Sequence, residues 1–196
     1  MTLVPLGRVT LASRNAGKLR ELRALAGSRL ALELPPEDAP TVIEDGASYL
    51  ANARLKARSM AAHTHGWALA DDSGLEVDAL GGGPGIHSAR YGGPGLDDSG
   101  RYQHLLAALG DTADRGARFR CVLVLAHVDG REQVAEGTLE GAIARAASGS
   151  GGFGYDPVFE AAELGGRSLG LVAPEEKAAI SHRAVAMRAL LAALEA

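Results

Sequence analysis

Hydrophobic positions in the first third of the chain follow the spacing of a strand and then that of helices. Residues 8–13 place alternate hydrophobic side chains on one face, which predicts a short strand. After a tight turn, residues 18–26 repeat Leu and Ala at helical spacing. Ser48 is a plausible N-cap for a second helix that extends to about residue 63.

The rest of the chain mixes both kinds of element. The further predicted elements are a buried strand over 67–71 that ends in an acidic turn, a helix capped by Ser99, a hairpin over 119–144 that turns at Asp129-Gly130, and a terminal helix capped by Ser181. Because a long hairpin interrupts the alternation of strands and helices, we predict an α/β fold with a mixed sheet. The length of 196 residues favours a single domain over residues 1–196, with at most two lobes.

Composition narrows the class of protein. The chain is 46% hydrophobic and 22% charged, which is ordinary globular usage. Its net charge is -4 and no basic arm runs along it, so we expect no nucleic-acid partner and only local phosphate binding. A single cysteine, Cys121, rules out an intramolecular disulfide framework. No signal peptide or membrane-spanning run is visible, and we expect a cytoplasmic protein without a membrane partner.

Lysine is rare in this chain. Lys and Arg total 20, and the only lysines are Lys18, Lys56 and Lys177. Since Arg supplies most of the basic charge, a retained lysine indicates a position where a compact ammonium is preferred to a planar guanidinium. Lys56 lies four residues after Asn52 on the second predicted helix. It either extends along an apolar stripe to solvent or reaches a cleft, where it offsets acidic or phosphate groups.

A strand, a short turn and a helix follow one another around residues 13–18. Free backbone N–H groups and the helix dipole at such a helix start attract phosphate, and a lysine adds a point charge. The glycine spacing of a Walker loop is absent. An ordinary helix start with a solvated lysine is the alternative. The candidate phosphate-binding residues are Ser13, Arg14, Asn15, Ala16, Gly17 and Lys18.

Asp71 and Asp72 are adjacent carboxylates, and on an extended strand they point to opposite sides. One of them can face a cleft, where it can bind Mg²⁺ or accept a proton from an attacking water. A turn built from Asp, Ser and Gly is the alternative interpretation. Glu44, in a second acidic turn, is either a further magnesium ligand or part of the cap of the following helix.

Two segments near the C-terminus could contact a base. The glycine-rich residues 148–156 include Phe153, which can stack on a base, although a flexible hairpin with core aromatics is the alternative. Lys177 and the predicted helix start at His182 and Arg183 suit phosphate or a purine carbonyl, although such residues often serve only surface or packing roles. The histidines show no zinc-ligand spacing.

Taken together, these segments resemble the non-standard purine nucleoside triphosphate pyrophosphatases, the inosine triphosphatase or XTP/dITP diphosphatase family. The matching segments occur in family order and cover nearly the whole chain, and all three lysines lie within them. They are residues 13–18, 44–57, 70–80, 84–91, 151–159 and 175–183. Arg14 occupies a variable position of the first motif. His87 stands where Tyr is frequent, which removes no catalytic group.

The resemblance implies a role for each candidate residue. Asp72 is the expected general base and a magnesium ligand, and Glu44 is the possible second ligand. The expected substrate-binding residues are Ser13 to Lys18, Lys56 and Ser73, followed by Phe153, Gly154, Tyr155, Asp156, Lys177, His182 and Arg183. The implied fold is a long mixed sheet flanked by helices, with two lobes around a central nucleotide-binding cleft, in a homodimer.

The implied reaction is magnesium-dependent hydrolysis of ITP, dITP and XTP to the monophosphate and pyrophosphate, which cleanses the nucleotide pool. Water would attack the α-phosphorus. A hydrogen-bond donor such as Arg183 would pair with the 6-oxo group and would leave an adenine amine unpaired. Two other functions stay open: a pyrophosphatase for modified pyrimidine nucleotides, and a non-catalytic nucleotide sensor. Extra negative charge at Asp71 and Asp72 favours an enzyme, since a binder of phosphate has little use for it without a metal.

Overall fold

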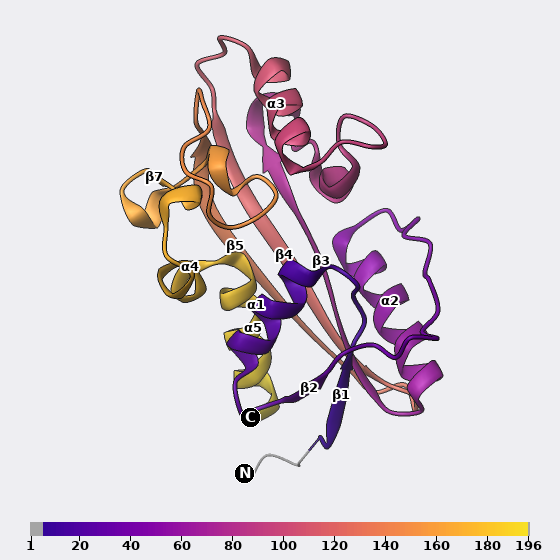
Figure 1. Ribbon diagram of the computed structural model, residues 1–196. Coiled ribbons are helices and arrows are strands. Elements are labelled where there is room, and N and C mark those ends of the chain that lie inside the picture. Colours follow the sequence, from indigo (N-terminus) through magenta and orange to yellow (C-terminus); the bar gives the residue numbers. More distant parts are fainter. Residues whose placement is uncertain (1–5, 196) are drawn as a thin grey trace. The chain divides into compact units, whose positions relative to one another are not determined.

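A computed structural model describes residues 6–195, and a seven-stranded sheet runs through it in the order β2-β1-β3-β4-β5-β6-β7 (Figure 1). The strands are β1 (Arg8–Leu11), β2 (Ala31–Glu33), β3 (Trp67–Val77), β4 (Gly116–His127), β5 (Glu132–Ile143), β6 (Phe159–Ala161) and β7 (Arg167–Ser168). β1 is parallel to β2 and β3, whereas β6 is antiparallel to β5 and β7. The predicted α/β fold with a mixed sheet is therefore confirmed.

Helices accompany the strands. They are α1 (Ala16–Ala26), α2 (Tyr49–Thr64), α3 (Asp98–Leu109), α4 (Pro174–Ile180) and α5 (His182–Glu195), with short 3-10 turns at Asp78–Leu80, Gly85–Arg90, Asp156–Val158, Ala162–Leu164 and Leu169–Leu171. Across residues 6–195, none of them is long and apolar enough to cross a membrane. Ser48 caps α2 as predicted, since its Oγ accepts a hydrogen bond from the Ala51 N–H at 3.2 Å.

Two helix starts differ from the prediction. α1 begins at Ala16 rather than residue 18, because the Asn15 side chain accepts a hydrogen bond from the Lys18 N–H at 3.1 Å and caps the helix. α3 is capped by Asp97 and not by Ser99, since Asp97 Oδ1 accepts a hydrogen bond from the Gly100 N–H at 2.7 Å. Asp and Asn are as favourable as Ser at this position.

The prediction that the strand ends in an acidic turn after residue 71 is wrong. Strand β3 continues through Asp71 and Asp72 to Val77, and it lies between β1 and β4 in the sheet. Alternate apolar positions resume at Leu75 and Val77, both fully buried, so sheet pairing and packing override the local turn preference of Asp, Ser and Gly. β2 and α4 were not predicted, because a three-residue strand and a seven-residue helix carry little periodicity.

The described chain forms two compact units. Unit 1 contains the residues up to Asp72, then Cys121–Gly137, then those from Arg183 onward. Unit 2 contains Ser73–Arg120 and Thr138–His182. The single-domain organisation of residues 1–196 and the central cleft stay predictions.

The core of unit 1 packs α1 and α5 against one face of the strands (Figure 1). Leu22 of α1 and Leu190 of α5 share a buried cluster with Val9, Leu69 and Leu123 of the strands. The other face of β3 carries Ala68 and Ala70 toward α2, whose buried side is also small, with Ala53 and Ala57. Small side chains on this face allow α2 to approach the strands closely.

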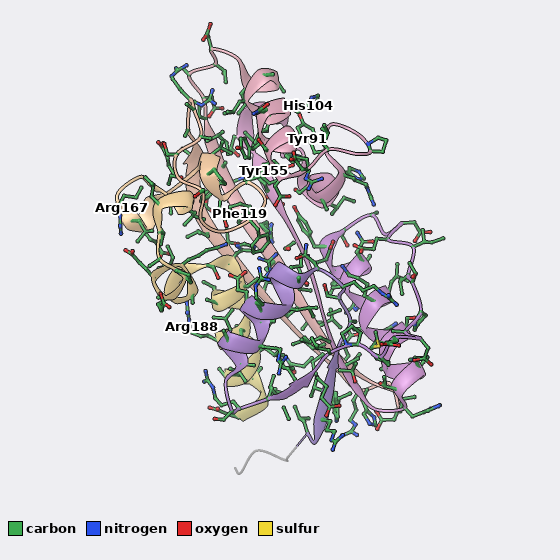
Figure 2. All side chains as sticks on the ribbon, in the orientation of Figure 1. Tyr91, His104, Phe119, Tyr155, Arg167 and Arg188 are labelled. Carbon is green, nitrogen blue, oxygen red and sulfur yellow. The ribbon has the colours of Figure 1, made fainter. Side chains whose placement is uncertain are left out.

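In the core of unit 2, α3 packs against the parts of β3 and β4 that belong to this unit. Leu105 and Leu109 of α3 share a buried cluster with Leu75, Phe119 and Phe159. Aromatic side chains concentrate in this unit, where Figure 2 labels Tyr91, Phe119 and Tyr155. The Tyr155 hydroxyl donates a hydrogen bond to the Ser88 carbonyl at 2.8 Å, which links the glycine-rich loop to the Gly85–Arg90 turn.

We expect Ser48→Ala to lower the free energy of unfolding by about 1 kcal/mol, because α2 loses its N-cap hydrogen bond. Urea unfolding followed by circular dichroism measures this change. Ser48→Asp keeps a side-chain acceptor at the cap and should stay close to the parent. Equal stability of the alanine variant and the parent would show that the cap contributes nothing.

Candidate functional site

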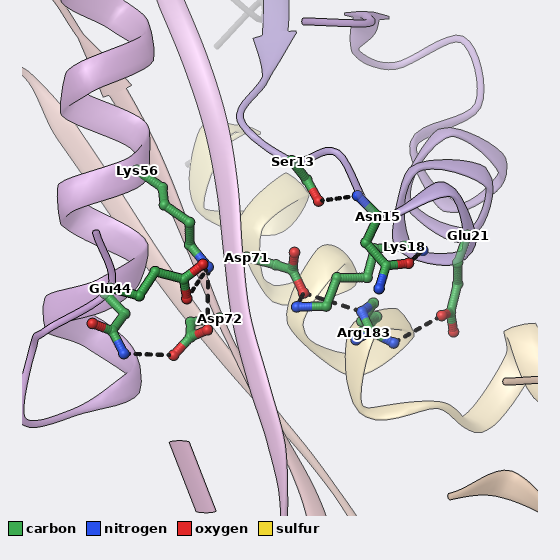
Figure 3. A network of polar contacts seen from close by, with 10 residues as sticks. Ser13, Asn15, Lys18, Glu21, Glu44, Lys56, Asp71, Asp72 and Arg183 are labelled. Carbon is green, nitrogen blue, oxygen red and sulfur yellow. Dashed lines mark hydrogen bonds and ion pairs between the residues drawn. The ribbon is translucent and has the colours of Figure 1, made fainter. Parts of the chain in front are cut away.

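Asp71 and Asp72 are neighbours on β3, and their side chains emerge on opposite faces of the strand (Figure 3). On one face, Asp71 lies with Lys18 of α1 and Arg183 of α5. On the other face, Asp72 lies with Lys56 of α2. Alternation along an extended strand thus supplies two separate acidic centres from two consecutive residues.

The Asp71 centre is a buried network of ion pairs. Asp71 Oδ2 lies 2.9 Å from the Lys18 Nζ and accepts a hydrogen bond from the Arg183 Nε at 3.2 Å. A second donor of Arg183, Nη1, bonds the Glu21 carboxylate at 3.0 Å. Burial by itself raises the pKa of Asp71, but Lys18 and Arg183 reverse this and hold it well below the ordinary value. Asp71 is therefore ionised near neutral pH and fixes both cations.

The Asp72 centre joins β3 to α2 and to the loop before α2. Lys56 Nζ donates to Asp72 Oδ1 at 3.1 Å and to Glu44 Oε2 at 3.0 Å. Asn52 Nδ2 donates to Asp72 Oδ2 at 3.3 Å. Burial, reinforced by Glu44, raises the pKa of Asp72, while the ammonium groups of Lys56 and Lys18 oppose this rise. A carboxylate with a raised pKa is better able to accept a proton from water than an ordinary one.

Glu44 and Asp72 together fit a magnesium ion. The two carboxylates converge on a single cation, the Lys56 ammonium, so both reach one point of positive charge. Mg²⁺ commonly takes one or two carboxylates and completes its shell with water and substrate phosphate. Among residues 6–195, no group of three or more His, Cys, Asp or Glu side chains is arranged so that it could hold a metal ion.

The predicted phosphate-binding segment lies at the start of α1. Asn15 caps the helix, and its own N–H donates to Ser13 Oγ at 3.2 Å. The Arg14 side chain donates a hydrogen bond from Nη2 to the Ala39 carbonyl at 2.8 Å. Ala16 is exposed and Gly17 partly exposed, so the helix terminus is accessible. Lys18 is bound to Asp71 rather than solvated, which contradicts the alternative of an ordinary surface lysine.

A second group of predicted residues lies within unit 2. The Asp156 carboxylate, in the glycine-rich loop region, accepts hydrogen bonds from the Phe153 N–H at 2.8 Å and from Lys177 Nζ at 2.6 Å. The Lys177 ammonium lies 4.6 Å from the centre of the Phe153 ring. His182 stacks on Phe119, with ring centres 4.9 Å apart and planes 13° from parallel.

The remaining predicted residues are Gly154, Tyr155 and Ser73. The Gly154 N–H donates to Asp98 Oδ2 at 2.7 Å, and Tyr155 is buried against Ser88. Ser73 follows Asp72 on β3 and is partly buried. The predicted residues thus divide between the two units, with Ser13–Lys18, Glu44, Lys56, Asp72 and Arg183 in unit 1, and with Ser73, Phe153–Asp156, Lys177 and His182 in unit 2.

Each of the three lysines pairs with a buried carboxylate. Lys18 pairs with Asp71, Lys56 with Asp72 and Lys177 with Asp156, at 2.9, 3.1 and 2.6 Å. All three carboxylate side chains are at least nine-tenths buried. The rarity of lysine in the sequence did indicate positions with a special electrostatic environment.

Three polar residues that were not predicted to belong to the site bond its residues, although the spacing of Asn52 from Lys56 was noted. Glu21 bonds Arg183, Asp98 bonds the Gly154 N–H, and Asn52 bonds Asp72. Glu21 lies three residues after Lys18 on the same helix, and Asn52 lies four before Lys56, so helical spacing was the available signal. Asp98 carried no such signal, because its partner is 56 residues away in the chain.

Known proteins of similar sequence and structure show to which family this chain belongs. The sequence pattern of the Ham1 family matches residues 9–193. The chain belongs to the Ham1 family. It is 50% identical over 195 residues to the dITP/XTP pyrophosphatase of Thioalkalivibrio sulfidiphilus, covering 96% of this chain and 98% of the relative. The structure of the Staphylococcus aureus Ham1 protein superposes with a TM-score of 0.86 at 38% identity, over 96% of this chain and 98% of that one.

A second relative gives the same result. The dITP/XTP pyrophosphatase of Methylococcus capsulatus is 48% identical over 196 residues, covering 96% of each chain. The resemblance inferred from the sequence motifs is therefore confirmed at the level of the family, and so is the fold.

We expect Asp71→Asn to destabilise the protein by about 3–5 kcal/mol, because it removes the carboxylate that neutralises Lys18 and Arg183 in a buried site. Guanidinium unfolding at neutral pH measures the loss. Glu33→Gln, which breaks the exposed pair with Arg8, is the matched control and should change stability little. Coincident unfolding curves for Asp71→Asn and the parent would contradict the stabilising role of the network.

Proposed function

We propose that this chain hydrolyses the non-standard purine nucleoside triphosphates ITP, dITP and XTP to the nucleoside monophosphate and pyrophosphate. The observation that carries the proposal is the Asp72 centre, where a buried carboxylate lies with Lys56 and Asn52 and shares Lys56 with Glu44. It occurs in a chain 50% identical, over nearly its whole length, to a protein named dITP/XTP pyrophosphatase. Such an enzyme acts on acid anhydrides and removes deaminated purines from the nucleotide pool.

In this proposal Asp72 is the general base. It would accept a proton from the water that attacks the α-phosphorus, and burial has already moved its pKa toward that task. Glu44 and Asp72 would hold the magnesium ion. When bound, Mg²⁺ neutralises charge on the phosphate oxygens and on the pyrophosphate that leaves.

The chain's own cations would bind the polyphosphate. The start of α1 offers the backbone N–H groups of Ala16 and Gly17, and Lys18 adds positive charge at the same helix terminus. Lys56 adds a second ammonium at the Asp72 centre. Because these ammonium groups already lie against carboxylates, they are held in position before the substrate binds. Phosphate oxygens of the substrate would replace the carboxylates as partners of Lys18 and Lys56, and Glu44 and Asp72 would be the residues that hold the metal.

The resemblance to the family assigns base recognition to the glycine-rich loop, His182 and Arg183. Phe153 would stack on the purine, and Gly154, Tyr155 and Asp156 would line the base and sugar pocket, together with Lys177, His182 and Ser73. Arg183 and His182 would lie near the purine edge. Arg183 donates to Asp71 and Glu21, so its orientation toward a 6-oxo group would depend on these carboxylates.

We further propose that the enzyme is a homodimer, as the resemblance to the family implies, and that it acts in the cytoplasm. Light scattering coupled to size-exclusion chromatography measures the mass of the 20.1 kDa chain in solution.

A nucleotide panel with and without magnesium tests the function. We expect release of pyrophosphate from ITP, dITP and XTP, little from ATP and GTP, and none when the metal is chelated. Preferential turnover of modified pyrimidine triphosphates would favour the alternative pyrophosphatase. Binding of ITP that raises the melting temperature without releasing pyrophosphate would favour a sensor. Release of orthophosphate would contradict the proposed bond cleavage.

Asp72→Asn should lower kcat by at least about 100-fold, in the range typical of general bases, while the dissociation constant for ITP changes little. Single-turnover hydrolysis and calorimetric ITP binding with Ca²⁺ in place of Mg²⁺ separate the two effects. Hydrolysis of ITP at the parental rate would show that Asp72 is not the base.

A further inference from the structure

Asn52 links the two carboxylates that we assign to magnesium. We infer that Asn52 is a positioning residue, which sets the separation of Glu44 and Asp72 by binding the loop of one and the carboxylate of the other. The inference rests on the proposed function, because that function makes Glu44 and Asp72 the metal ligands.

The two ends of one buried amide each make a hydrogen bond. Asn52 is 1% exposed, so no solvent competes for its groups. Its Oδ1 accepts from the Gly46 N–H at 2.8 Å, and its Nδ2 donates to Asp72 Oδ2 at 3.3 Å. Gly46 is two residues after Glu44, so the first bond fixes the end of the loop that carries Glu44.

The chemistry of the partners determines the amide orientation. The Gly46 N–H is only a donor, and it must face the carbonyl oxygen of the amide. An ionised Asp72 is only an acceptor, and it must face the amide nitrogen. Among the natural side chains of this length, Asn alone supplies both groups, whereas Asp supplies two acceptors and Leu supplies neither.

The loop has no space to move toward Asn52. A Cβ on Gly46 would lie 2.6 Å from Asn52 Oδ1 and 2.8 Å from the Ala51 Cβ, both too short for a contact. The backbone of the Glu44 loop therefore lies directly on the first turn of α2. Lys56, one turn further along α2, contacts Glu44 and Asp72 through its ammonium. Two successive turns of α2 therefore bind the Glu44 loop and Asp72, the first through Asn52 and the second through Lys56.

Three variants distinguish the hydrogen bond between Asn52 and Gly46 from the one between Asn52 and Asp72. Asn52→Asp keeps an acceptor for Gly46 but replaces the donor to Asp72 by a second negative charge. Gly46→Ala places a methyl group against Asn52 Oδ1 and so displaces the loop, while the chain keeps both polar groups of the Asn52 amide. Asn52→Leu has a similar volume and removes both hydrogen bonds.

We expect Asn52→Asp and Asn52→Leu to lower kcat for ITP by about 10- to 100-fold, the range reported when partners of metal ligands are removed, with a smaller change in KM. Gly46→Ala should raise the Mg²⁺ concentration for half-maximal activity by about tenfold, since it displaces the Glu44 loop. Mn²⁺ binding to the nucleotide-free protein, measured by calorimetry, should weaken in Gly46→Ala and in Asn52→Leu.

Amide hydrogen exchange at Gly46 tests the link without turnover. The Gly46 N–H should exchange slowly in the parent and in Asn52→Asp, and at least about tenfold faster in Asn52→Leu, since a lost hydrogen bond opens the amide to solvent. This measurement and Mn²⁺ binding remain informative even if the parent fails to hydrolyse ITP. A failure of the proposed function is thereby distinguished from a failure of the positioning role.

Met60→Ala controls for simple destabilisation. Met60 lies buried on the same helix but contributes nothing to the proposed site, so its truncation should lower the melting temperature and leave kcat and the magnesium dependence unchanged. The inference is overturned if Asn52→Leu keeps the parental kcat, Mn²⁺ affinity and Gly46 exchange rate. It is also overturned if Met60→Ala reproduces the catalytic losses at equal stability.

Discussion

The alternation of side chains along β3 is the constraint on which both acidic centres depend. Because successive residues of an extended strand face opposite sides, Asp71 and Asp72 enter different environments despite being adjacent. Asp71 enters the side covered by α1 and α5, where Lys18 and Arg183 keep it ionised. Asp72 enters the side covered by α2, where burial raises its pKa. One peptide unit thus separates a structural carboxylate from one suited to proton transfer.

Ammonium and carboxylate groups are paired throughout the proposed site. Burying a charge without a partner is costly, so each lysine can reach a buried position only because a carboxylate accompanies it. The same pairing keeps long, flexible lysine side chains ordered before any substrate arrives, which reduces the entropy lost on binding. The electrostatic effects also extend beyond the paired groups, since the Lys18 charge opposes the rise in the pKa of Asp72 although Lys18 itself contacts Asp71.

Helix α2 contributes more to the site than its one predicted residue, Lys56. Its N-cap at Ser48, the amide of Asn52 and the ammonium of Lys56 follow one another along the helix, and the last two contact Asp72. Small residues on the facing surfaces, such as Ala53 and Ala70, bring the helix close enough for these short polar side chains to reach the strand. Apolar packing therefore determines where the polar groups lie.

The sequence by itself determined the mixed α/β class, the Ser48 cap, the hairpin and the family, because periodicity, capping residues and ordered motifs are local properties of the chain. It also identified the three lysines, through their rarity beside 17 arginines. Only the tertiary structure decided that β3 continues through Asp71 and Asp72, because that depends on the strands on either side. The bonds from Arg183 to Asp71 and Glu21, and from Asn52 to Asp72, likewise join segments that folding brings together, which lie 112, 162 and 20 residues apart in the chain.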